Sequence, residues 1–117
     1  GPGDHAAAAP ALAVAGDRGI DAVGKCDILG SAALLERATL FVGNDSGLMH
    51  VSAAAGTPTL GLFGPSEWWH KAPYGPKGRV LAAAPVRGEF APITALSVDQ
   101  VFAEVLALYD TFARSGR

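Results

Sequence analysis

Short apolar runs alternate with alanine-rich or polar segments along most of the chain. Four runs have the length of strands and are bounded by glycine, proline or polar residues: 19–23, 38–43, 58–64 and 79–83. The run 38–43 is nearly continuous, as in strands that are buried on both faces of a parallel sheet. These runs predict the strands of such a sheet.

The segments between the runs favour helices. Residues 5–15 are rich in alanine and favour a helix despite Pro10. Asp27 can cap a helix that continues to about Arg37. The apolar face of this second helix is expected to contain four residues: Leu29, Ala33, Leu34 and Ala38. Another helix is expected over residues 47–55, because Gly56 and a proline follow it.

The C-terminal segment has the clearest helical pattern. Ser97 and Gln100 form a capping box, and we expect one long helix over residues 97–115. Its apolar stripe would contain Val98, Val101, Phe102, Val105, Tyr109 and Phe112. Residues 64–78 are rich in proline and glycine and are expected to form a loop. The order of elements predicts an α/β fold, a Rossmann-like parallel sheet flanked by helices, as a single domain over residues 1–117.

Composition narrows the possible functions. The 117 residues are 50% hydrophobic and carry a net charge of -2, so a core can form and nothing in the charge favours nucleic acid as a partner. A single cysteine, Cys26, excludes an internal disulfide and fits a reducing cytoplasm. The sequence contains no long uncharged apolar run and no signal-peptide pattern, so we expect a soluble protein.

The candidate site lies where the apolar run 38–43 ends. Ligands of parallel α/β sheets bind at the carboxyl ends of strands, and here the sequence continues as Asn44-Asp45-Ser46-Gly47 into a predicted helix. The free N–H groups of the first turn attract a phosphate, and Gly47 allows it to approach the backbone closely. The Asp45 carboxylate suits sugar hydroxyls or the N–H groups of the turn. The alternative is that Asp45 or Ser46 only caps the helix.

Other chemistries have weaker support in the sequence. "GNDSG" does not match the G-x-S-x-G elbow of serine hydrolases. His5, His50 and His70 share no metal-ligand spacing. The sequence contains neither a G-x-G-x-x-G motif nor a Walker lysine motif, which disfavours the common dinucleotide and nucleoside-triphosphate sites.

Residues 43–66, "GNDSGLMHVSAAAGTPTLGLFGPS", resemble the signature of the ADP-heptose:lipopolysaccharide heptosyltransferases, which are bacterial glycosyltransferases of the two-domain GT-B architecture. Residues 1–4, "GPGD", and residues 23–38 resemble flanking segments of that family more weakly. The resemblance implies the C-terminal, donor-binding half of such an enzyme. The N-terminal acceptor domain and the first strand of the C-terminal domain would then lie upstream of Gly1.

The resemblance also implies roles for single residues. The N–H groups of Ser46, Gly47 and Leu48 would hold the donor diphosphate, and His50 would lie one helical turn further on. Asp45 would bind hydroxyls of the transferred heptose, and the neighbouring Asn44 is taken as part of the same substrate site.

The remaining positions that the resemblance assigns lie outside this motif. Asp4 would bind the ribose, unless it is only a surface turn residue. Lys25 and Cys26 would line the adenine. Trp68, Trp69 and His70 would lie near the place where the two domains face each other, where they could contact donor or acceptor, or only pack the loop.

The implied reaction transfers heptose from ADP-heptose to the lipopolysaccharide inner core. The N-terminus of the helix would stabilise charge on the leaving ADP, so neither a cofactor nor a metal is required. The general base, and the contacts with the lipid A-core acceptor, would belong to the missing domain. By itself the chain is therefore expected to bind the donor without catalysis, in the cytoplasm or at the inner face of the membrane.

Two other functions remain open from the sequence. One is a glycosyltransferase or epimerase of the same fold that uses another sugar nucleotide, and the other is a non-catalytic nucleotide-binding fragment. If the first strand is missing, the strand that borders the gap exposes an unpaired edge, and we expect the fragment to self-associate or to cover this edge with its C-terminal helix.

Overall fold

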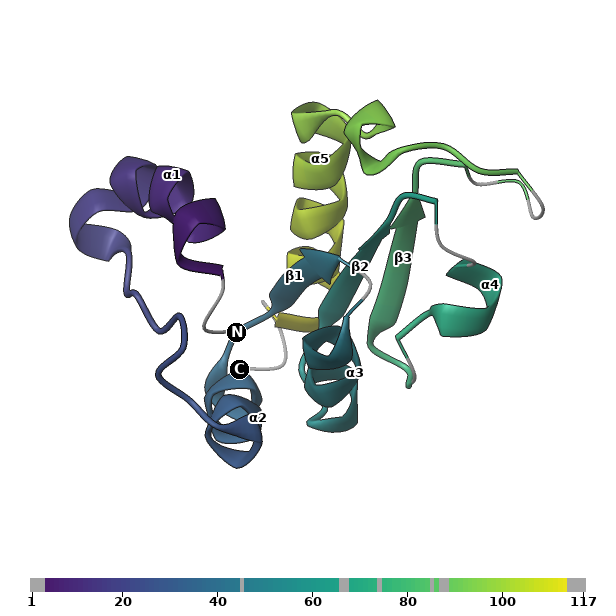
Figure 1. Ribbon diagram of the computed structural model, residues 1–117. Helices are drawn as coiled ribbons and strands as arrows, with labels where there is room; N and C mark the ends of the chain where they lie inside the picture. Colours follow the sequence, from purple (N-terminus) through teal and green to yellow (C-terminus); the bar gives the residue numbers. More distant parts are fainter. Residues whose placement is uncertain are drawn as a thin grey trace. The chain divides into compact units, whose positions relative to one another are not determined.

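The computed structural model describes residues 4–44, 46–65, 68–73, 75–84, 86 and 89–113 (Figure 1). The chain divides into two compact units, residues 1–31 and residues 32–117, and each is described by itself. The assignment of residues 1–117 to one domain stays a prediction.

The first unit begins with α1 (His5–Ala15), as the alanine-rich sequence predicts, and Pro10 lies inside this helix. The helix stops at Gly16, whose φ of 55° suits glycine, and a single 3₁₀ turn, η2 (Gly16–Arg18), follows.

The strand predicted over residues 19–23 is wrong. Residues 19–22 are irregular and residues 23–25 form a turn. The Asp21 carboxylate accepts a hydrogen bond from the Val23 N–H at 3.0 Å, and Gly24 has a φ of 70°. These local contacts satisfy the backbone in a turn in place of a sheet ladder.

Helix α2 (Ile28–Arg37) begins where the capping prediction places it. The Asp27 carboxylate accepts the Gly30 N–H at 2.6 Å. The predicted apolar face is wrong, since Leu29, Ala33 and Leu34 are exposed, whereas Leu35 is half-buried.

The second unit is built on a three-stranded parallel sheet of β1 (Phe41–Asn44), β2 (Thr59–Phe63) and β3 (Gly78–Ala82), in that order. Phe41 pairs with Thr59, and Thr59 pairs with Gly78. The α/β class and the parallel sheet are therefore confirmed. The prediction that β1 is central and buried on both faces is wrong: β2 is the central strand of the described sheet, while β1 lies at its edge with Val42 and Asn44 exposed.

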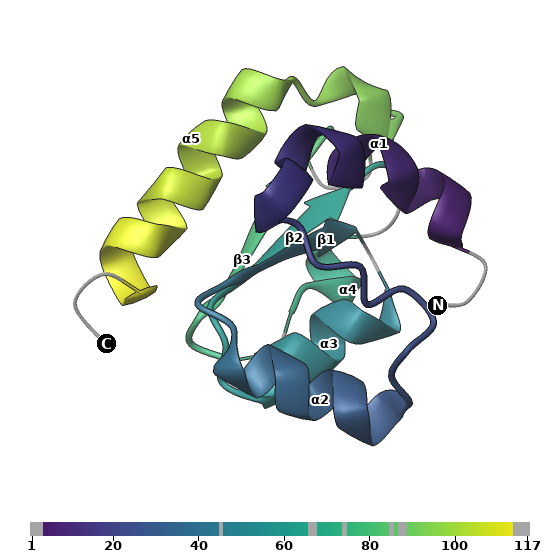
Figure 2. The same cartoon turned by 90° about the vertical axis from the view of Figure 1, so that its left-hand side faces the viewer.

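Helices cover both faces of this sheet (Figures 1 and 2). Thr59 and Gly61 of β2 face α3 (Gly47–Ala54), because the Thr59 hydroxyl bonds to Ser52 and a Cβ at Gly61 would lie 2.5 Å from the Met49 sulfur. Leu62 faces the opposite side, toward α5 (Val98–Leu108).

The loop predicted over residues 64–78 contains one short helix, α4 (Trp68–Lys71). Sequence patterns did not predict it because tertiary contact holds it: the Trp68 Nε1–H donates to the Ala84 carbonyl oxygen at 3.1 Å. A 3₁₀ turn, η3 (Ile93–Ala95), precedes the last helix.

Helix α5 has the predicted capping box, in which Ser97 and Gln100 exchange hydrogen bonds of 2.8 and 3.0 Å. The chain continues as a π-helix, η4 (Tyr109–Ala113), and residues 114–115 of the predicted helix lie outside the described residues. Part of the apolar stripe is open to solvent, with Val98 84% and Phe102 60% exposed. Association of the chain through this flank and the β1 edge stays a prediction.

Candidate functional site

The candidate site lies at the carboxyl end of β1, where the chain enters α3. The helix begins at Gly47, two positions after Asp45, so the predicted strand-to-helix junction is confirmed. Asp45 itself lies outside the described residues. Asn44, Gly47, Leu48 and the His50 side chain are exposed at this junction, and Ser46 is half-buried. The structure thus brings together the described residues of the motif.

The N-terminus of α3 differs from those of α2 and α5. The Ser46 side chain makes no capping hydrogen bond, whereas Asp27 and Ser97 each cap their helix. The backbone of Ser46 is also more extended than that of Ser97, with φ values of -158° and -84°. The first N–H groups of α3 are therefore not capped by the Ser46 hydroxyl, and they carry the positive end of the helix dipole.

Gly47 leaves the surface of the first turn open. A Cβ built at this position would meet no atom within 4 Å. A ligand oxygen can therefore reach the backbone N–H groups without a steric obstacle. His50 follows Gly47 by three positions and lies on the same side of the helix, so its imidazole borders this surface.

A chain of buried hydroxyl groups anchors the opposite end of α3. The Thr59 hydroxyl donates to the Thr57 carbonyl oxygen at 2.8 Å, so its oxygen accepts the Ser52 hydroxyl at 2.7 Å. The Thr57 hydroxyl donates to the Leu35 carbonyl oxygen at 2.6 Å. Ser52 and Thr59 are fully buried. These positioning residues fix α3 on β2, and sequence reasoning missed them because serine and threonine are also common in solvent.

The end of α3 is closed by a Schellman motif. The Gly56 N–H donates to the Ala53 carbonyl oxygen at 3.1 Å, and the Thr57 N–H donates to the Ser52 carbonyl oxygen at 3.2 Å. Gly56 has the positive φ, 82°, that this motif requires. The Gly-Thr-Pro segment of the sequence signature therefore has a structural role in setting the orientation of the helix.

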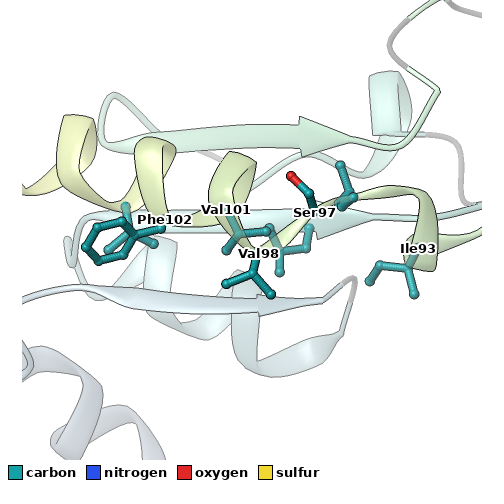
Figure 3. Close-up of a pocket in the computed structure, with 8 residues that line it drawn as sticks. Ile93, Ser97, Val98, Val101 and Phe102 are labelled. Atoms are coloured by element: carbon teal, nitrogen blue, oxygen red, sulfur yellow. The ribbon is translucent and has the colours of Figure 1, made fainter.

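An apolar cavity of about 360 Å³ lies on the α5 face of the sheet (Figure 3). Its wall includes Leu62, which is the register partner of Asn44, so the cavity lies beside the end of β1. The lining residues are Leu62, Ile93, Leu96, Ser97, Val98, Val101, Phe102 and Val105. Apart from the Ser97 hydroxyl, the side chains that line it carry no polar group, so this cavity offers little to a polar ligand.

The three other predicted site residues belong to the first unit. Asp4 is exposed and precedes α1, but its side chain makes no capping hydrogen bond. Lys25 ends the turn of residues 23–25, where its N–H donates to the Ala22 carbonyl oxygen at 3.1 Å. Cys26 is a free, exposed thiol. Their assignment to the ribose and the adenine stays a prediction.

Two further properties of the described residues bear on the chemistry. In the described ranges, no three His, Cys, Asp or Glu side chains lie close enough together to hold a metal ion. Among the helices that the structure describes, none is both long enough and apolar enough to span a bilayer.

A paired substitution tests the difference between the two serine N-caps. Ser97→Ala is expected to lower the free energy of unfolding by about 1 kcal/mol, because it removes a capping hydrogen bond. Ser46→Ala is expected to change this free energy by less than about 0.5 kcal/mol, because its hydroxyl caps nothing. Urea denaturation of both variants measures the difference. Equal losses would contradict the description of α3 as uncapped by Ser46.

Comparisons with known proteins identify the family of the chain. The sequence profile described as glycosyltransferase family 9 (heptosyltransferase) matches residues 2–88. The lipooligosaccharide heptosyltransferase 2 of Haemophilus influenzae is 32% identical over 62 residues, which are 53% of this chain and 18% of that protein.

A solved structure is also similar. The glycosyl transferase family 9 protein from Veillonella parvula DSM 2008 matches with a TM-score of 0.82 and 29% identity, over 92% of this chain and 34% of that chain. The chain thus spans about a third of the length of this solved relative. Because the family profile covers well over half of the chain, the protein belongs to glycosyltransferase family 9, the heptosyltransferase family.

Proposed function

We propose that this chain is the donor-binding part of a heptosyltransferase that uses ADP-heptose. Glycosyl transfer requires a sugar-nucleotide donor and an acceptor, and the membership in family 9 supports this class of reaction. The observation that carries the proposal is the N-terminus of α3, which the Ser46 hydroxyl leaves uncapped beside an open Gly47 at the carboxyl end of β1. This geometry suits a diphosphate.

In this proposal the N–H groups of Ser46, Gly47 and Leu48 bind the diphosphate. His50 borders the same turn and donates a further hydrogen bond to a phosphate oxygen. Asn44 and Asp45 bind hydroxyls of the heptose. The Asp45 carboxylate accepts hydrogen bonds from these hydroxyls while the sugar is transferred, and it is the proposed catalytic residue. In the first unit, Asp4 binds the ribose and Lys25 and Cys26 border the adenine.

The reaction itself is a displacement at the anomeric carbon. An acceptor oxygen forms a bond to this carbon while the bond to the β-phosphate oxygen breaks, and ADP leaves with the electron pair. The acceptor proton goes to a general base, which this proposal places outside residues 1–117. The role of α3 is to stabilise the negative charge that develops on the diphosphate, by N–H donation and by the helix dipole.

ADP-heptose is proposed as the donor because residues 43–66 resemble the heptosyltransferase signature. The acceptor is proposed from the name of a relative. The Haemophilus protein is a lipooligosaccharide heptosyltransferase, and the acceptor proposed for this chain is accordingly the inner core of lipopolysaccharide. Transfer to such an acceptor places the enzyme in the cytoplasm, at the inner face of the membrane.

Gly47→Ala is expected to weaken binding of ADP at least about tenfold, or about 1.4 kcal/mol. The new methyl group meets no atom of the protein, but it occupies the surface over which a phosphate must approach. The free energy of unfolding is expected to be unchanged or slightly higher, since alanine favours helices more than glycine does. Calorimetric titration and urea denaturation measure the two effects separately. Unchanged ADP affinity would refute a diphosphate site at this turn.

Titration of the unaltered chain with ADP, UDP and GDP separates the alternative functions. Preference for ADP supports heptosyl transfer from ADP-heptose. Preference for UDP or GDP points to a family member with another sugar nucleotide. If none of the three nucleotides binds, the chain does not act as a donor-binding domain.

A further inference from the structure

Helix α3 contacts β2 through two buried points that differ in kind. In the first turn of the helix, Met49 packs on Gly61, where a Cβ would lie 2.5 Å from the Met49 sulfur. Three positions further on, the Ser52 hydroxyl bonds to the Thr59 hydroxyl at 2.7 Å. Met49, Ser52 and Thr59 are each fully buried. The helix is thus held by an apolar contact and by a hydrogen bond, both on the face that looks toward the sheet.

The two contacts constrain the helix to different degrees. Apolar packing is non-directional, so the Met49 contact permits small rotations and shifts of α3 that keep the thioether buried. A hydrogen bond between two buried oxygen atoms weakens steeply when its geometry changes. The Thr59 hydroxyl cannot follow such a shift, because it also donates to the Thr57 carbonyl oxygen at 2.8 Å. The hydroxyl pair therefore fixes the position of α3 along and around its own axis.

Stability alone is a weak reason to place hydroxyl groups here. An alanine and a valine would fill nearly the same space without polar atoms. Two buried hydroxyls contribute little net free energy, because their hydrogen bonds to water are lost on folding. Within the described part of the chain, every buried side-chain nitrogen or oxygen atom has a hydrogen-bond partner, so this pair is satisfied. What the pair adds over an apolar contact is direction.

The same helix carries the proposed donor site at its N-terminus. Ser52 follows Gly47 by five positions, which is about 7.5 Å along a helix axis. The backbone hydrogen bonds of α3 keep so short a helix rigid, so a rotation or shift at Ser52 also displaces the first turn. The N–H groups of that turn must be aligned with the oxygen atoms of a phosphate to bind it well.

We propose that Ser52 and Thr59 are positioning residues for the donor diphosphate. Their hydroxyl pair sets the rotation and the axial position of α3, and this directs the N–H groups of Gly47 and Leu48 toward the phosphate oxygens. Both hydroxyls act through the helix, since both are fully buried beneath it. The inference rests on the proposed function, because it takes the ligand of α3 to be a diphosphate.

The test compares ligand binding with stability in the unaltered chain and its variants. ADP and inorganic pyrophosphate are titrated calorimetrically, the second because it carries only the part of the donor that α3 binds, and urea denaturation gives the midpoint of unfolding. Ser52→Ala is expected to weaken binding of both ligands about tenfold, the equivalent of one N–H hydrogen bond to a phosphate. Thr59→Ser keeps the hydroxyl and is expected to bind both ligands within about twofold of the unaltered chain.

A double variant, Ser52→Ala with Thr59→Val, separates positioning from stability. Removal of both hydroxyls leaves an apolar contact of similar shape, so the urea midpoint is expected to return toward that of the unaltered chain. The affinities for ADP and pyrophosphate are expected to stay about tenfold weaker, because the directional contact is still absent. Leu108→Ala is the control: it removes a buried side chain of α5, so it lowers the urea midpoint and leaves both affinities unchanged.

The outcomes distinguish this inference from the proposed function. If the unaltered chain binds ADP and the double variant binds it equally well, the hydroxyl pair only stabilises the fold, and the inference is overturned while donor binding stands. A loss of affinity in Leu108→Ala as large as that in Ser52→Ala also overturns it, because binding would then follow stability alone. Variants that weaken ADP but not pyrophosphate place the effect away from the diphosphate and overturn it as well. If the unaltered chain binds neither ligand, the donor site and the positioning role are both refuted.

Discussion

Gly64→Ala is expected to lower the free energy of unfolding by about 3 kcal/mol, at the upper end of the usual cost of overpacking. Gly64 is buried directly after β2, and a Cβ there would lie 2.7 Å from the Ile93 nitrogen and 3.1 Å from its Cα. These atoms belong to the backbone, so no change of rotamer can relieve the overlap. Urea denaturation is expected to show a midpoint lower by at least about 1 M.

Gly61→Ala provides the matched comparison. At this position the first obstacle is the Met49 sulfur, 2.5 Å from the added Cβ, and a thioether side chain can move. Gly61→Ala is therefore expected to lower the free energy of unfolding by less than Gly64→Ala does, by about 1 to 2 kcal/mol. A Gly64→Ala variant as stable as the unaltered chain would contradict the close packing of Gly64 against Ile93.

Asp45→Ala is expected to reduce the turnover of ADP-heptose roughly ten- to a thousandfold, or about 1.4 to 4 kcal/mol of transition-state stabilisation. The physical reason is that a carboxylate bound to sugar hydroxyls contributes most when the donor is fully engaged. Release of ADP is measured in a transferase that combines this domain with an acceptor-binding half.

The control for this experiment is another acidic residue. Asp17 is exposed in η2, and Asp17→Ala is expected to leave turnover unchanged. Circular dichroism and denaturation confirm that the Asp45 variant is folded. Turnover at the unaltered level in a folded Asp45→Ala enzyme would exclude the proposed role.

The sequence predicted best those elements whose signals are local. The capping box of α5, the Asp27 cap of α2 and the glycine that ends α3 depend on residues a few positions apart, and all three are present. The buried run that became β2 was long and apolar enough to be recognised. Because Gly56 ends the helix after β1, the strand-to-helix junction could be predicted from the sequence, whereas the roles of its residues stay predictions.

The features that the sequence patterns missed depend on the presence or absence of distant contacts. Residues 19–23 have the composition of a strand, but a strand needs a partner, and the Asp21 side chain stabilises a turn in its place. Helix α4 depends on a hydrogen bond between residues 16 positions apart. The hydroxyl chain of Ser52, Thr57 and Thr59 likewise exists only after α3 packs on β2.

The central place of β2 also bears on how the second unit folds. Phe41 pairs with Thr59 and Thr59 with Gly78, so each pairing joins residues fewer than about 20 positions apart. Pairing β2 with β1 or with β3 therefore costs less loop-closure entropy than pairing two strands that are far apart in the sequence. Both pairings share β2, so neither can form without it. The strand that supports α3 is therefore also the one on which formation of the whole sheet depends.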